Sequence, residues 1–239
     1  SAPGLFFSLK QAAVPIGVTL AGLLLPLGLA MIGWRTTLWI AAAACVLLAV
    51  LFVPLTRRLE PGRTPAAAAA GPGWLASLLH ALRVPVLRRL SLMSLAYAMT
   101  QQGFLAFIVS LLHLELGLPL ALAAGLLATS QVGSTLMRVA LGHVADRWVR
   151  PRLLLAALGF LMSLCCLMLG LLPREASLPA IVLVVVACGT TAAGWNGVFF
   201  AELVRNVPRR EDMAAAAGGT QFFTFAGGML GPFLFAQVV

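Results

Sequence analysis

The sequence predicts an all-α fold, a polytopic bundle of membrane-spanning helices. Of its 239 residues, 61% are hydrophobic and 10% are charged, whereas a soluble domain carries about 25% charged residues. The charges are spaced so that seven long stretches contain none, and a helix needs only about 20 residues to cross a bilayer. These stretches have 24, 21, 25, 22, 21, 26 and 27 residues and cover positions 11–34, 36–56, 90–114, 116–137, 153–173, 176–201 and 213–239. Polarity does not alternate along them as it would in the strands of a membrane barrel, so we expect seven helical spans.

The basic residues indicate which helix ends face the cytoplasm. If consecutive links lie on opposite sides, 13 of the 16 Lys and Arg residues gather on one side, two lie on the other, and Arg138 lies at the end of the fourth span. Cytoplasmic loops carry this excess of positive charge. We therefore expect residues 57–89, 143–152 and 205–212 to be cytoplasmic. Fifteen arginines against one lysine are typical of a GC-rich bacterial genome, which favours an inner (plasma) membrane.

The spans and links divide the chain into three parts. Residues 1–56 hold the first two spans, and Pro15 and Gly17 make the first of these easy to bend and pack closely. Residues 57–89 form the longest link, which begins as a Pro/Ala/Gly-rich linker. Its second half, WLASLLHALRVPVLRRL, has the apolar face and basic residues of an interfacial helix. Residues 90–239 hold the remaining five spans.

The link after the fourth span concentrates charge in a short motif. The stretch GHVADRWVRPR, residues 142–152, resembles the G-x-x-x-D-R-x-x-R-[KRP]-[KR] loop of the major facilitator superfamily of transporters. The matching residues are Gly142, Asp146, Arg147, Arg150 and Arg152. In the family a looser copy of this loop joins helices 8 and 9, and the long basic link resembles the one between helices 6 and 7.

This resemblance implies a register for the whole chain. The seven spans correspond to helices 5 to 11 of the family's twelve, so we expect an interior fragment without helices 1–4 and 12. Residues 1–56 would then close the N-terminal bundle, and residues 90–239 would form the C-terminal bundle without its final helix. The resemblance also implies alternating access, in which two six-helix bundles rock about a central site.

The charged motif is also a candidate gate. The resemblance implies, through the family's pseudo-symmetry, that Asp146 faces the positive end of the first span, whose cytoplasmic start lies around Gly4 to Lys10. An anion there gains about 0.3–1 kcal/mol. Arg150 needs an acidic partner, and Glu202, at the cytoplasmic end of the sixth span, is the best candidate. We hypothesise that these residues latch the cytoplasmic side in one conformation and release it in the other. The alternative is topological, with charges that only mark the cytoplasmic face.

Arg138 is the strongest candidate for substrate binding. It lies eight residues before Asp146, hence about 12 Å deeper in the membrane, where an ionised side chain costs at least roughly 2.5 kcal/mol. Gln131, Ser134 and Arg138 share one helix face at i, i+3 and i+7, as the wall of a water-filled cavity would. A guanidinium binds oxyanions through paired hydrogen bonds, so we expect an organic or inorganic anion as substrate. The position also resembles that of the arginine that monocarboxylate transporters use for their substrate. The alternative is that Arg138 extends to the interface.

Polar residues in other spans complete the candidate cavity. They are Tyr97 and Gln101 in the third span, Trp195 and Asn196 in the sixth, Gln221 in the seventh, and Lys10 and Gln11 at the mouth of the first. Polar faces on several helices are what a binding site near the bilayer midplane requires. Each residue alone is better explained by a hydrogen bond between helices than by contact with a ligand.

Other functions compete with this interpretation. Efflux of drugs or metabolites is the alternative within the family, although the first span departs from the Gly-Pro and Gly-Gly pairs of its drug–proton antiporters. A seven-helix receptor is the different class, but a retinal protein needs a lysine in its last span, and the only lysine is Lys10. An enzyme is not expected because His80, His113 and His143 are scattered and build no catalytic cluster.

The expected partners are few. We expect the lipid bilayer and a small-molecule substrate, with or without a co-transported proton or other ion as in a symporter. The four cysteines lie in uncharged stretches as packing residues, so neither a metal nor a cofactor is expected. The net charge of +9 sits at helix ends rather than on one soluble face, which disfavours nucleic acid. We expect a monomer.

Overall fold

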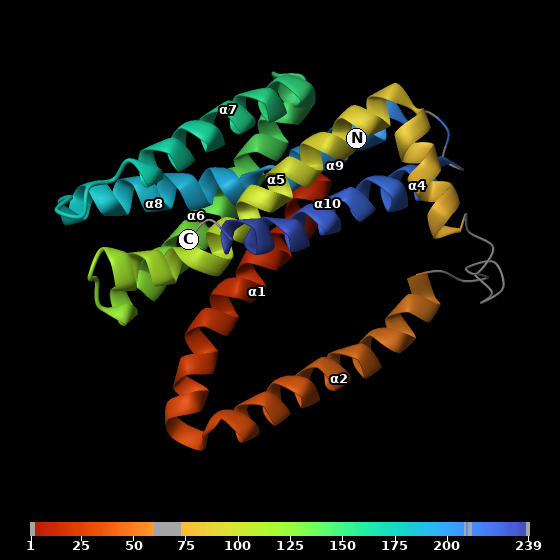
Figure 1. Ribbon diagram of the computed structural model, residues 1–239. Coiled ribbons are helices and arrows are strands. Elements are labelled where there is room, and N and C mark those ends of the chain that lie inside the picture. The colour runs from red at the N-terminus through yellow and green to blue at the C-terminus, as the bar shows by residue number, and fades with distance from the viewer. Residues whose placement is uncertain (1–2, 60–72, 208, 210–211, 238–239) are drawn as a thin grey trace. The chain divides into compact units, whose positions relative to one another are not determined.

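The computed structural model describes residues 3–59, 73–207, 209 and 212–237 (Figure 1). The side chains of residues 1–12, 15, 22, 23, 25, 26 and 55–59 lie outside the described part. Helices make up 89% of the structure, with no strand in those ranges, which confirms the all-α prediction. Contacts group the chain into two units, residues 20–71 and residues 1–19 together with 72–239.

Residues 20–71 contain a helical hairpin. Helix α1 (Pro3–Ile32) ends at Gly33, whose φ of +78° turns the chain into α2 (Trp34–Leu59). The backbone amide and the hydroxyl of Thr37 both donate to the Gly33 carbonyl, at 3.1 and 2.8 Å. Gly28 of α1 faces Thr37 so closely that an added Cβ would lie 2.7 Å from its Cγ2. Glycine is therefore required at both positions, at one by the turn and at the other by the close approach.

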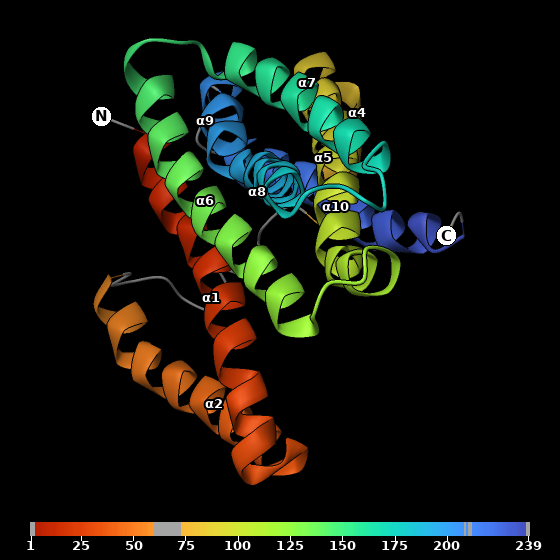
Figure 2. The same ribbon diagram turned by 90° about the vertical axis from the view of Figure 1, so that its left-hand side faces the viewer.

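The remaining helices form a second bundle. They are α4 (Trp74–Arg83), α5 (Pro85–Ser110), the π-helical turn η1 (Leu111–Glu115), α6 (Leu120–Arg147), α7 (Pro151–Gly170), α8 (Leu178–Gly194), α9 (Asn196–Asn206) and α10 (Met213–Phe235). Proline opens α5 and α7, where its missing amide costs no hydrogen bond. Helix α5 packs along α10, α6 packs along α8, and α7 lies against α8 and α9 (Figures 1 and 2).

Five helices of the described part are long and apolar enough to cross a membrane. They cover Trp34–Pro54, Pro85–Glu115, Leu120–Arg147, Pro151–Gly170 and Leu178–Asn206. The first and last of the seven expected spans are helices as well, α1 and α10, but they are not among the five. In α10 the apolar residues are diluted by glycine, threonine and Gln221, which lowers its hydropathy.

Helices occupy much of the expected link over residues 57–89. Helix α2 continues to Leu59, residues 60–72 lie outside the described part, α4 follows, and α5 begins at Pro85. The amphipathic helix ends at Arg83 rather than running on, because Pro85 cannot continue its hydrogen-bond ladder and instead opens α5. Trp74 of α4 is exposed, whereas Ala81 is buried where α4 packs on α5 and α10.

The contact between α5 and α10 depends on glycines. A Cβ at Gly227 would strike the backbone carbonyl of Leu95, and one at Gly231 would strike that of Met99. Small residues allow membrane helices to approach this closely. Helix α10 is therefore held against α5 by backbone-to-backbone packing.

Candidate functional site

The polar face of α6 lies against α8. Gln131, Ser134 and Arg138 are 2%, 0% and 1% exposed. Gly133 lies between them and faces Thr190 of α8 so closely that a Cβ there would strike its hydroxyl. Figure 2 shows the two helices side by side. The face that the sequence predicts as the wall of a water-filled cavity is buried in this structure, and Arg138 contacts α8 from it.

The guanidinium of Arg138 points at the end of α8. Its Nε donates a hydrogen bond of 2.7 Å to the carbonyl of Ala193. Helix α8 ends at Gly194, so this carbonyl belongs to the last turn of the helix. Carbonyls of the last turn receive no hydrogen bond from an amide of their own helix. The helix C-terminus also carries partial negative charge, which favours a cation there. Arg138 thus turns toward α8 instead of extending to the membrane interface.

The break after α8 brings together three of the predicted residues. Trp195 separates α8 from α9 and keeps an αR backbone, with φ −78° and ψ −24°. Its indole Nε1 donates to Gln101 Oε1 of α5 at 3.0 Å, and Asn196 Nδ2 approaches the same oxygen at 3.4 Å. One amide oxygen of α5 therefore accepts both polar side chains at the break.

Tyr97 lies in the core. Its hydroxyl donates to the carbonyl of Leu155 in α7 at 2.5 Å. The ring is 8% exposed and meets that of Trp195 edge to face, with centroids 5.4 Å apart. In this structure Tyr97 joins α5, α7 and the helix break, and does not line an open cavity.

Two polar atoms near Arg138 lack hydrogen-bond partners. They are Nε2 of Gln131 and Oγ of Ser134, and both are buried. Leaving such a group unsatisfied costs about 1–3 kcal/mol. Both can donate, as the guanidinium does, so the buried face of α6 presents hydrogen-bond donors from three successive turns.

The remaining cavity candidates do not join this cluster. Gln221 is half-buried on α10. Lys10 and Gln11 belong to α1, and their side chains lie outside the described part.

The charged motif is partly helical. Helix α6 continues to Arg147 and α7 begins at Pro151, so the expected loop shortens to residues 148–150. Gly142 is buried and Asp146 is half-buried, and the three arginines are exposed, namely Arg147, Arg150 and Arg152. The expected partner of Asp146, the start of the first span, belongs to residues whose side chains lie outside the described part.

Glu202 has a different partner from the one expected. Asn206, one turn later on α9, donates to Glu202 Oε1 at 3.0 Å and to its backbone carbonyl at 2.8 Å. Arg150 and Glu202 are both described, and they form no ion pair in this structure. One ion pair among the described residues joins Arg174 to Glu115 at 2.7 Å, between the ends of α7 and η1 opposite the motif.

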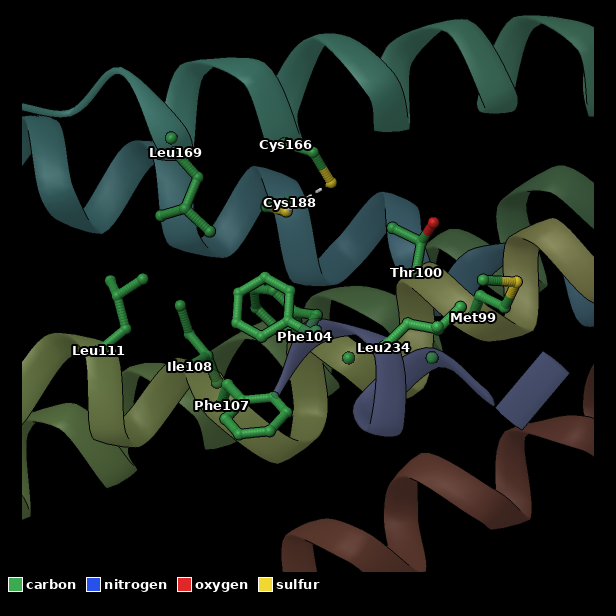
Figure 3. Close-up of a pocket in the computed structure, with 14 residues that line it drawn as sticks. Met99, Thr100, Phe104, Phe107, Ile108, Leu111, Cys166, Leu169, Cys188 and Leu234 are labelled. Carbon is green, nitrogen blue, oxygen red and sulfur yellow. Dashed lines mark hydrogen bonds between the residues drawn. The ribbon is translucent and has the colours of Figure 1, made fainter. Parts of the chain in front are cut away.

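A cavity of about 500 Å³ lies elsewhere in the bundle, between α5, α7, α8 and α10 (Figure 3). Its walls are apolar, with Phe104 and Phe107 of α5 facing Leu169 and Leu234. None of the predicted cavity residues lines it. Two thiols border it, Cys166 and Cys188, with their sulfurs 3.7 Å apart.

Sequence reasoning missed two parts of this arrangement. The acceptor for Arg138 is a backbone carbonyl, which leaves no residue signature. The apolar cavity follows from how four helices pack, and its aromatic and aliphatic residues look like any core in the sequence. A signal for the break did exist, since GWNG at 194–197 interrupts an apolar span.

The comparison with known families covers nearly the whole chain. The sequence profile of the Major Facilitator Superfamily matches residues 2–232. No curated protein matches the sequence. The family consists of secondary transporters, which agrees with a multi-pass helical membrane protein. This chain belongs to the Major Facilitator Superfamily.

Proposed function

We propose that the protein transports a small organic or inorganic anion by alternating access, with Arg138 as the residue that binds it. The observation that carries the proposal is a guanidinium only 1% exposed inside a spanning helix. It lies on the same face as two buried donors without partners, Gln131 and Ser134. An oxyanion can accept hydrogen bonds from all three groups at once, and it attracts the positive charge of the guanidinium.

The proposed site is buried in this structure. Gly133 of α6 and Thr190 of α8 pack closely beside it, and we propose that it becomes accessible when the surrounding helices move in the transport cycle. Polar residues at such an interface are consistent with a site near the bilayer midplane. Gln101 and Asn196, at the neighbouring helix break, are proposed to contact the substrate when the face opens.

Uptake by the full-length protein in liposomes tests this proposal. Radiolabelled acetate, lactate and inorganic phosphate serve as probes. Charge-assisted hydrogen bonds contribute about 1.5–3 kcal/mol, so Arg138→Ala should weaken the apparent affinity roughly 10- to 100-fold. Arg138→Lys keeps the charge but lacks the planar guanidinium, so its apparent affinity for the anion should lie between those of the parent and Arg138→Ala. Exposed Arg209 supplies the control, since Arg209→Ala should transport normally. Normal transport by Arg138→Ala would contradict the proposal.

We further propose that Arg150 and Glu202 pair in the alternate conformation and latch the cytoplasmic side. Glu202 now contacts Asn206 and would exchange this partner for Arg150. Arg150→Gln and Glu202→Gln should each change transport, and the double variant should add nothing to either, because both remove the same contact. Additive effects, or none, would rule the latch out.

A second candidate function is efflux of an apolar compound, which the cavity of about 500 Å³ favours. Gly103 lines this cavity, and a Cβ on it meets nothing within 4 Å. Gly103→Leu can therefore fill the cavity without disturbing the helices. If the cavity carries the substrate, this variant should abolish export of a fluorescent lipophilic dye. If Arg138 carries it, anion uptake should be unchanged.

A further inference from the structure

The interruption between α8 and α9 is held from outside by Arg138. Ala193 stands two residues before Trp195, in the last turn of α8. Its carbonyl accepts the Nε–H of Arg138, which comes from another helix. The hydrogen bond is charge-assisted and lies away from water, so it is among the strong ones.

A bound anion and the Ala193 carbonyl would both interact with the positively charged guanidinium of Arg138. An oxyanion that binds the edge formed by Nε and a terminal nitrogen must displace the Ala193 carbonyl. An oxyanion that binds the other edge attracts the guanidinium and weakens its hydrogen bond to the Ala193 carbonyl. Either geometry loosens the end of α8.

We propose that Arg138 clamps the break between α8 and α9, and that a bound anion releases this clamp. The inference rests on the proposed function, because it gives the same guanidinium a second partner. Arg138 is thus both the anion ligand and the residue that sets the geometry of the break.

A change at the break would affect two other parts of the molecule, the contact with α5 and the position of α9. Trp195 and Asn196 both donate to Gln101, so a looser break changes the contact with α5. Helix α9 begins at Asn196 and carries Glu202 six residues later, about 9 Å along the helix. Movement of α9 therefore moves the carboxylate proposed for the cytoplasmic latch.

Tryptophan fluorescence reports on the break directly. Trp195 is 1% exposed and hydrogen-bonded, and a variant with Trp195 as sole tryptophan isolates its signal. It requires phenylalanine at Trp34, Trp39, Trp74 and Trp148. Acetate and inorganic phosphate should shift the Trp195 emission to the red, and amide exchange in the first turn of α9 should become faster. A variant that keeps only exposed Trp148 is the control and should not respond.

Two substitutions of Arg138 distinguish the effect of its hydrogen bond to Ala193 from the effect of its positive charge. Arg138→Gln keeps a donor for the Ala193 carbonyl without the charge, so Trp195 should emit as in the parent and lose its response to anions. Arg138→Ala removes both, so its emission should be red-shifted before any anion is added. Far-ultraviolet circular dichroism checks that each variant is folded, and Arg138→Gln preserves the test if Arg138→Ala is not.

The outcomes distinguish this inference from the proposed function. If acetate or phosphate is transported in an Arg138-dependent way while Trp195 and the exchange of α9 stay unchanged, the coupling is wrong and the transport proposal survives. If no anion is bound or transported, both fail. If both Arg138 variants keep the parent's Trp195 emission and exchange without anion, Arg138→Ala being folded, Arg138 does not clamp the break.

Discussion

Substituting a single glycine of α10 tests the packing of the bundle. A Cβ on Gly227 would lie 2.9 Å from Cα and from the carbonyl carbon of Leu95, and closer still to the carbonyl oxygen. These are backbone atoms that can move only with α5 itself. Overpacking of this kind costs about 1–3 kcal/mol. The higher helix propensity of alanine returns about 0.5–1 kcal/mol, so Gly227→Ala should lower the free energy of unfolding by about 0.5–2 kcal/mol.

The adjacent residue provides a matched control. A Cβ on Gly228 would meet the Cγ of Gln102 at 3.3 Å, and a flexible side chain can move aside. Gly228→Ala should therefore be neutral or stabilising by up to about 1 kcal/mol. Equilibrium unfolding of both variants in mixed micelles, followed by circular dichroism, measures the difference. Equal stabilities of the two variants would refute the inferred contact between the helix backbones.

Three further predictions follow from single contacts. An added oxidant should join Cys166 and Cys188 into a disulfide, visible by mass spectrometry as the loss of two hydrogens, because their sulfurs lie 3.7 Å apart; no cross-link would mean that α7 and α8 pack differently. Tyr97→Phe should destabilise the protein by about 0.5–1.5 kcal/mol in thermal unfolding, because it removes the hydrogen bond from the Tyr97 hydroxyl to the Leu155 carbonyl that joins α5 to α7; an unchanged transition would contradict this. Glu115→Gln should cost less than about 1 kcal/mol, and less in high salt, because this acid and its arginine partner are 56% and 80% exposed; a larger loss would show that the pair is shielded.

The fold was predictable because burial in lipid leaves a strong mark on composition. Each uncharged stretch is helical, the sixth as two helices, α8 and α9, and the amphipathic segment of the long link contains α4. The ends of the helices were harder to predict than their existence. Helix α6 extends to Arg147 because charged residues near a membrane surface can remain helical, and α4 stops where Pro85 begins a new helix.

The candidate site was predictable only in part. The spacing of Gln131, Ser134 and Arg138 placed them correctly on one helix face. Which helix this face meets depends on how α6 and α8 align, and on glycines such as Gly133 that let them approach. The contact between Glu202 and Asn206 was readable in principle, since residues four apart meet on a helix.

The glycine contacts of α10 bear on how the protein is made. Helix α10 is not among the five helices of the described part that are apolar enough to cross a bilayer by themselves, and its close approach requires the carbonyls of Leu95 and Met99 to be in place. During synthesis α5 emerges first and can wait in the bilayer as a template. Docking on that template should then help α10 to enter lipid, so the insertion of α10 depends on a segment translated much earlier.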